Sequence, residues 1–208
     1  SISFEIDNDG YDIPEYYYAD GYLEDKIARI NALGKAAGAN GNIFLFITDC
    51  HTTQNAGHSP ALINYIAQRT HIPRLFDGGD DYNGGSQKWA DTLRKAFGGK
   101  CYFAMGNHEF MGVTGSELYY KYDIANNDQI GNAERHYYYI DDVQMKTRYI
   151  VMSAFGDVVN GAVANGYESD QITWLTDVAL NVGVGWSIIL ITHGAYTTGH
   201  LSTEWILP

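Results

Sequence analysis

The sequence predicts an α/β protein whose first half contains a sheet of parallel strands. Between residues 43 and 105, short apolar runs alternate with amphipathic segments in the order strand, helix, strand, helix, strand. A polar cluster follows each of the three apolar runs. Parallel α/β architecture places active sites at the carboxyl edge of the sheet, so we expect these clusters to meet there.

Length and composition are those of a globular domain. The chain has 208 residues and domains span roughly 150, which indicates one domain or a little more. Hydrophobic residues make up 45% and charged residues 18%, a composition that supports a real core. We divide the chain into an N-terminal extension, residues 1–40, with one helix packed on a main domain, residues 41–208.

Charge and hydropathy argue against some partners. Lys and Arg number 13 against 25 Asp and Glu, a formal net charge of −12, whereas proteins that hold duplex DNA need a basic surface. A nucleic-acid partner is therefore not expected. No apolar run approaches the ~18–20 residues that cross a bilayer, so no membrane partner is expected either. The chain shows no signal peptide, which favours the cytoplasm, although a leader could have been removed and the compartment stays open.

Periodicity predicts the elements of the first half. Residues 22–37 place Leu23, Ile27, Ile30 and Leu33 at helical spacing, which predicts an amphipathic helix. The first apolar run is continuous, as in a strand that is buried on both faces. Strands are expected at 43–47, 72–76 and 101–105, and the helices between them at 60–70 and 87–97.

The second half is less regular. Residues 111–135 are polar, which predicts a helical insertion or a loop. Residues 136–140 and 147–155 are rich in aromatic and β-branched side chains, which predicts an antiparallel pair. A helix is expected to begin near Ser169 behind a Ser or Asp cap, and residues 186–192 predict a last buried strand.

Three polar clusters follow the three predicted parallel strands. Asp49-Cys50-His51 has a carboxylate and an imidazole at positions i and i+2, which point to the same side of an extended segment. In Gly79-Asp80-Asp81-Tyr82-Asn83, glycine allows close approach of another chain segment to a carboxylate. Gly106-Asn107-His108-Glu109 offers an amide oxygen and an imidazole that can act as an acid. Taken alone, the first cluster is more typical of a solvated loop and the second of an ordinary turn. The third is as typical of a capped turn as of a functional site.

A fourth position, His193, ends the predicted strand 186–192, where a lone histidine is usually structural. Together, the four positions supply two carboxylates, three imidazoles and an amide at one edge of a sheet. A hydrophobic core has no use for this set. A dinuclear metal centre does, and its mixed oxygen and nitrogen donors suit Mn, Fe, Zn or Ni.

In this order the clusters resemble the first four motifs of the calcineurin-like metallophosphoesterase family, whose pattern is D-x-H, G-D-x-x-D/N, G-N-H-E/D, a lone strand-end His and then G-H-x-H. The segment 171–175 also resembles the family's Gln…Trp-Leu helix. The resemblance covers roughly residues 43–193. It implies a four-layer α-β-β-α sandwich, two divalent metal ions and phosphoester hydrolysis.

The resemblance also implies roles for the matching residues. Metals ~3.5–4 Å apart acidify a bridging water, which serves as the nucleophile. His108, with Asn107, would contact the phosphate, and His108 would protonate the leaving oxygen. The implied metal ligands are Asp49 and His51 for one ion, Asn107 and His193 for the other, and Asp80 for both.

Two features depart from the family pattern. Asn83 stands where many members have an Asp that orients the catalytic histidine, so either Asn83 accepts that hydrogen bond or Asp81 takes over. No G-H-x-H follows His193. The segment 199–202 lacks the second histidine, and we do not expect His200 to be a ligand. We therefore expect a C-terminally truncated fragment, whose apolar ending at 205–208 has no helix cap, with poorly occupied metal sites and low activity.

The leading interpretation is a hydrolase that acts on a small phosphomonoester or phosphodiester. Two alternatives stay open: a nuclease, which shares the site but expects a basic groove, and a catalytically silent scaffold with the same fold. Substrate specificity is expected from the loops over the metal-binding edge of the sheet, namely 52–60, 84–88, 111–135 and 156–168. The sequence leaves the oligomeric state open.

The remaining histidines and the cysteines carry weaker signals. His58 is expected in an exposed loop from which it could reach the cleft, and His71 and His136 are expected to be structural or solvent-facing. Cys50 and Cys101 are too few for a disulfide framework and are expected to be buried free thiols.

Overall fold

A computed structural model describes residues 13–38, 41–51, 58–127 and 134–194. Predictions about residues 1–12 and 52–57, about His200 and about the ending at 205–208 lie outside the described residues, as does the side chain of His58. The elements in chain order are η1 (Glu15–Gly21), α1 (Tyr22–Ala37), β1 (Leu45–Ile47), α2 (His58–Arg69), β2 (Leu75–Asp77), α3 (Gln87–Ala96), β3 (Cys101–Phe103), α4 (Gly115–Lys121), η3 (Ile124–Asn127), β4 (Tyr138–Asp142), β5 (Thr147–Val151), β6 (Phe155–Val159), β7 (Ala162–Asn165), α5 (Ser169–Trp174), η4 (Leu175–Ala179) and β8 (Ser187–Ile191).

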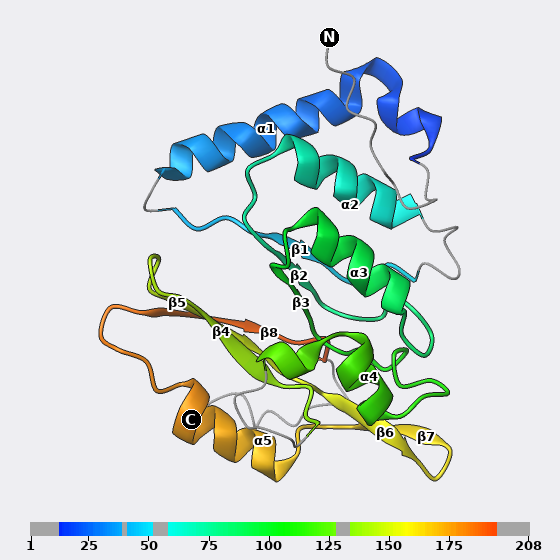
Figure 1. Ribbon diagram of the computed structural model, residues 1–208. Coiled ribbons are helices and arrows are strands. Elements are labelled where there is room, and N and C mark those ends of the chain that lie inside the picture. The colour runs from blue at the N-terminus through cyan, green and yellow to red at the C-terminus, as the bar shows by residue number, and fades with distance from the viewer. Residues whose placement is uncertain (1–12, 39–40, 52–57, 128–133, 195–208) are drawn as a thin grey trace.

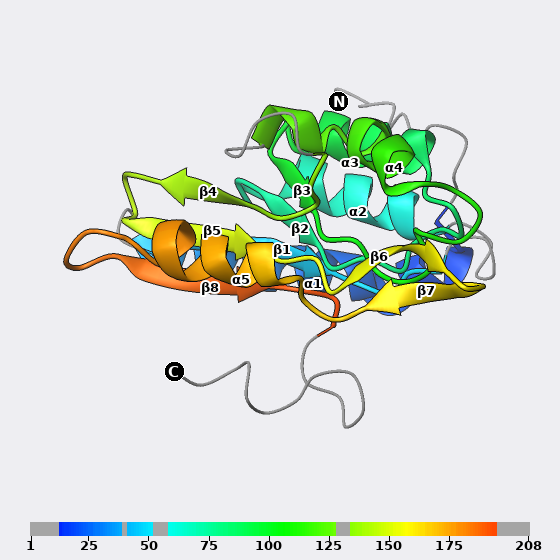
Figure 2. The same cartoon turned by 90° about the horizontal axis from the view of Figure 1, so that it is seen from below.

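The elements stack in four layers, as the family resemblance implies (Figure 1). Helices α1, α2 and α3 lie on the outer side of one sheet, and α5 lies on the outer side of the second sheet. The same arrangement is visible from below, where α5 crosses in front of the second sheet (Figure 2). The predicted α/β class is therefore confirmed.

Strand order and direction differ between the two sheets. The first has the order β1-β2-β3 with all strands parallel, so that Leu45, Leu75 and Cys101 share one register position. The second has the order β4-β5-β8, in which β4 and β5 are antiparallel and β5 and β8 are parallel. Because the strands of the first sheet run in the same direction, their carboxyl ends meet at one edge.

Aromatic side chains join the two sheets. Phe76 of β2 stacks on Tyr149 of β5 with ring centroids 4.6 Å apart. Phe44 contacts both rings edge-on, at 5.5 and 5.6 Å. The hydroxyl of Tyr138 in β4 donates to the carbonyl of Phe103 in β3 and accepts from its N–H. The sheet interface is thus both packed and hydrogen-bonded, which aligns the ends of the first sheet with the second.

The edge strands are less buried than predicted. Phe46 in β1 is 48% exposed and Leu190 in β8 is 54% exposed, so the expectation of fully buried strands is wrong for both. The physical reason is position, because each of these strands has a single neighbour within the described part of the chain. In contrast, all three residues of the central strand β2 are buried.

Two further local predictions need correction. Residues 156–168 are not simply a loop, because they contain most of the antiparallel hairpin formed by β6 and β7, which begins at Phe155. The N-cap of α5 is Glu168, and its side chain makes no capping hydrogen bond, so the expected Ser or Asp cap is wrong. Part of the polar segment 111–135 is helical, because α4 begins there with a capping box formed by Thr114 and Glu117.

Helix α1 begins and ends where its spacing predicts, but it packs lightly. Leu23 is its buried residue, and Leu33 is 64% exposed. It is attached to α2, where the Asn31 Nδ2 donates to the carbonyl of Arg69 at 2.9 Å. Among the described helices, we find none with the length and apolar character needed to cross a membrane.

His136 is half-buried against α4, and we expect it to make folding pH-dependent. Its Nε2 bonds to the carbonyl of Gly115 at 2.8 Å, and its ring contacts Phe110 edge-on. Burial lowers the pKa of His136 from its ordinary 6.5. Below pH 6.5 the unfolded chain therefore takes up a proton that the folded chain resists, so stability is lost as the pH falls.

The measurement compares wild type with His136→Gln, a neutral side chain that can still donate to the Gly115 carbonyl. Urea unfolding at pH 7.5 and pH 5 should show a larger acid-side loss of unfolding free energy in wild type, by about 1.4 kcal/mol per unit of pKa difference. Equal losses in the two proteins would contradict this role of His136.

Candidate metal centre

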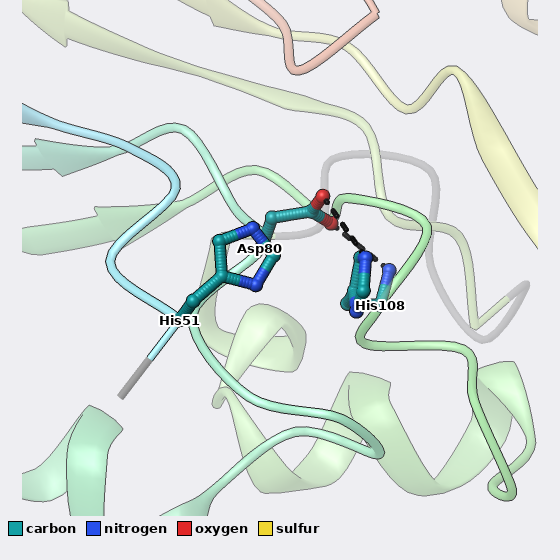
Figure 3. A group of neighbouring side chains, drawn as sticks. All are labelled: His51, Asp80 and His108. Carbon is teal, nitrogen blue, oxygen red and sulfur yellow. Dashed lines mark hydrogen bonds and ion pairs between the residues drawn. The ribbon is translucent and has the colours of Figure 1, made fainter. Parts of the chain in front are cut away.

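The polar clusters meet at the carboxyl edge of the parallel sheet, as the strand order predicts. Strand β1 leads into Asp49 and His51, β2 leads into Asp80, and β3 leads into His108. The side chains of His51, Asp80 and His108 face one another across these three turns (Figure 3).

Two glycines allow the turns after β2 and β3 to touch. Gly79 has a φ of +93°, and a Cβ there would lie 2.5 Å from the backbone nitrogen of Gly106. A Cβ on Gly106 would lie 2.1 Å from the Asp80 Oδ1. Larger residues would therefore separate the turns or displace the carboxylate, which explains the glycine that begins the second and the third polar cluster.

Asp80 is the central group of the site. Its Oδ2 lies 3.2 Å from the Nε2 of His193 and 3.9 Å from the Nε2 of His108, while its Oδ1 accepts from the backbone N–H of His108. Although burial opposes ionisation, the hydrogen bonds from His193 and His108 lower the pKa of Asp80. The carboxylate is thus held ionised, as a metal ligand must be.

His193 presents Nε2 to Asp80 because its other ring nitrogen is committed. The Nδ1–H donates to the carbonyl of Gly78 at 2.9 Å. Burial disfavours the charged ring, but the Asp80 carboxylate outweighs it and raises the pKa of His193. A backbone carbonyl on one imidazole nitrogen is the usual way to orient the other toward a metal.

Two groups of donors share Asp80. One contains His51, Asp80 and His108 and the other contains Asp49, Asp80 and His193, with one donor atom per residue and all atoms of a group within 4.8 Å of one another. Carboxylate oxygens with imidazole nitrogens fit Mn, Fe, Zn or Ni. The donor set present therefore fits a metal site with Asp80 in common.

The local geometry of the first cluster differs from the prediction. Asp49 and His51 have φ values of 55° and 42°, so the segment is a left-handed turn and not extended. The side chains still converge, with the Asp49 Oδ1 4.0 Å from the His51 Nε2. The turn follows from backbone pairing, because the N–H groups of these residues donate to the carbonyls of Gly79 and Asp80.

Asn83, and not Asp81, lies beside the predicted acid. The Nδ1 of His108 donates to the Asn83 Oδ1 at 2.7 Å. Asp81 points into the interior beside Asp77, and both carboxyls are buried. Burial, followed by the charge of Asp77, raises the pKa of Asp81, so this pair retains a proton that two separated carboxylates would lose.

Glu109 is a functional candidate that the sequence analysis missed. It is 1% exposed, and its carboxylate accepts four backbone hydrogen bonds. Burial raises the pKa of Glu109 to about 7, while the N–H donors oppose the rise. The donors are the N–H groups of Asp80, Asp81 and Tyr82 after β2, at 2.8, 2.8 and 3.2 Å, and of Gly106 after β3, at 2.8 Å.

The remaining predicted positions differ in how far they are buried. Asn107 is half-buried in the turn after β3, and His71 is exposed. Cys101 is buried as expected, whereas Cys50 is only half-buried, and neither forms a disulfide. Glu109 could have been recognised in the sequence from its position in the Gly106–Glu109 cluster, directly after the predicted acid His108.

A known protein family matches the part of the chain that contains the candidate metal centre. The family model described as calcineurin-like phosphoesterase matches residues 43–204. This match includes all four motif positions and most of the described structure. The comparison with curated proteins finds no match.

Proposed function

Because this chain belongs to the calcineurin-like phosphoesterase family, we propose that it hydrolyses a small phosphomonoester or phosphodiester at a dinuclear metal centre around Asp80. Metal-dependent phosphoester hydrolysis is the activity of the family. The observation that carries the dinuclear proposal is that Asp80 belongs to both donor groups. The net negative charge of the protein is no obstacle to an anionic substrate, because bound metal inverts the local charge.

The proposed ligands surround Asp80. Two divalent ions, Mn, Fe, Zn or Ni, would polarise the phosphoryl group and supply hydroxide at neutral pH when bound. Asn107 would also contact the phosphoryl oxygens. One ion would be held by Asp49, His51 and Asp80, and the other by Asp80, Asn107 and His193. This division differs from the two donor groups, in which Asp49 is with His193 and His51 is with His108.

His108 is the proposed acid. Its Nδ1–H is bonded to the Asn83 Oδ1, and its Nε2 faces the Asp80 carboxylate. The Nε2 therefore carries a proton only when the ring is an imidazolium. That proton would pass to the leaving oxygen of the ester, and Asn83 would hold the ring in position for the transfer.

Hydrolysis of p-nitrophenyl phosphate and its bis-ester tests the function. Protein stripped with EDTA should be inactive and should regain activity with Mn²⁺. His108→Ala should lower kcat by about 10²–10⁴-fold, the usual contribution of a positioned acid, while Mn²⁺ binding persists. No turnover of either ester by Mn²⁺-loaded protein would reject the hydrolase and favour the scaffold alternative.

We expect Asn83→Asp to shift the pH dependence of the reaction. A carboxylate beside Nδ1 stabilises the protonated ring of His108 more than an amide oxygen does. The basic limb of the kcat profile should therefore move to higher pH by about one unit. Asn160→Asp, at an exposed hairpin turn, adds the same charge and should leave the profile unchanged. An unmoved basic limb in Asn83→Asp would contradict the role of His108 as the acid.

A further inference from the structure

A cavity of about 510 Å³ lies beside the candidate metal centre, between the start of α4, the start of β4 and the β6–β7 hairpin. Phe155 lines it, and the Phe155 ring centroid is 5.7 Å from that of His193. Tyr167 also lines it, and its hydroxyl bonds at 2.8 Å to Thr192, the residue before His193. Through these two residues the cavity adjoins the segment that carries His193.

The cavity carries an excess of negative charge. Glu134, Asp157 and Glu168 line it together with the half-buried His136. Among the described lining residues there is one permanent cation, Arg135, which gives three negative charges against one positive. Arg135 is itself paired with Asp170 at 3.2 Å, outside the lining.

Four aromatic residues also line the cavity, of which Phe155 and Tyr167 are partly exposed. Phe110, Tyr137, Phe155 and Tyr167 all line the cavity. Aromatic faces attract organic cations through the ring quadrupole, and carboxylates attract them by charge. The carboxylates would repel a second phosphate, and a neutral group would leave their negative charge uncompensated.

We propose that this cavity binds an alkylammonium group on the organic part of the substrate while the phosphoryl group lies at the metal centre. This inference rests on the proposed function, because the cavity is placed relative to the metal centre. It names a substrate class, namely phosphoesters of amino alcohols or of their quaternary ammonium forms. The volume is within the range of ordinary small-ligand sites.

The kinetic test uses two substrates that differ at one atom. In p-nitrophenyl phosphorylcholine the organic group ends in a quaternary nitrogen, and in 3,3-dimethylbutyl p-nitrophenyl phosphate it ends in a quaternary carbon. With Mn²⁺ present, kcat/KM should favour the choline ester by about tenfold, as expected for a partly desolvated cation on aromatic rings. A ratio near one would overturn the proposal.

Asp157→Asn removes a charge from the cavity and keeps an oxygen for the N–H of Gly115, which the Asp157 Oδ1 now accepts. The preference for the choline ester should fall about threefold or more. Asp25→Asn is the matched control, because Asp25 is an exposed carboxylate on α1 that pairs with Arg29. An equal fall in both variants would assign the preference to the overall charge of the protein and would overturn the proposed role of the cavity.

A binding measurement separates this inference from the proposed function. Saturation-transfer NMR on EDTA-treated protein should detect choline and not 3,3-dimethyl-1-butanol, and Asp157→Asn should weaken the choline signal. This readout needs no catalysis. Hydrolysis of p-nitrophenyl phosphate without choline binding rejects the cavity alone, whereas choline binding without any hydrolysis rejects the proposed function and retains the cavity.

Discussion

Replacing Asp80 by asparagine is expected to lower metal-dependent hydrolysis by at least about a thousandfold and to remove most bound metal. Loss of an outer partner of a ligand already costs about 10–100-fold in affinity or activity, and Asp80 is a candidate ligand common to two ions. An amide has one neutral oxygen and cannot supply a bridging negative charge. The check is Mn²⁺ content by elemental analysis together with kcat/KM for p-nitrophenyl phosphate.

The fold should survive this change. The oxygen of the introduced amide could still accept the backbone N–H of His108, which the Asp80 Oδ1 now accepts at 2.9 Å. Asp91→Asn is the control, because Asp91 is an exposed carboxylate on α3 that pairs with Arg94. Full metal occupancy in Asp80→Asn would contradict the shared role of this residue, as would an equal loss in Asp91→Asn.

Glu109→Gln should have the second-largest effect, because it weakens the tie between two turns of the site. The amide keeps one oxygen but turns an NH₂ group toward backbone N–H donors that now have an acceptor. An unpaired buried donor costs about 1–3 kcal/mol, and more when a charged partner is lost. We expect the free energy of unfolding to fall by about 2–4 kcal/mol.

Metal binding should distinguish positioning from stability alone. Below its lowered melting temperature, Glu109→Gln should still bind Mn²⁺ at least about tenfold more weakly than wild type, because the turns that carry Asp80 and His108 lose their common anchor. Glu15→Gln, at an exposed position in η1, should change neither quantity. A folded Glu109→Gln protein with unchanged Mn²⁺ affinity would limit Glu109 to a structural role.

Local patterns were enough for most elements of the fold. The spacing of apolar residues predicted α1 and α3 to within a residue, and the runs of apolar residues located the three parallel strands. This works because side-chain burial repeats every 3.6 residues in a helix and every two in a strand. The same logic overestimated the burial of β1 and β8, since an apolar run does not reveal whether a strand lies at the edge of a sheet.

The sequence by itself determined the family and the residues of the candidate centre, because ligand type and order along the chain are local properties. Only the tertiary structure decided which groups meet. His193 bonds to Gly78, 115 residues away, and Asn83, rather than Asp81, lies beside His108. The carboxylates that line the cavity beside the centre come from separate elements. Such contacts depend on how sheets and turns pack in three dimensions, and no local periodicity records that packing.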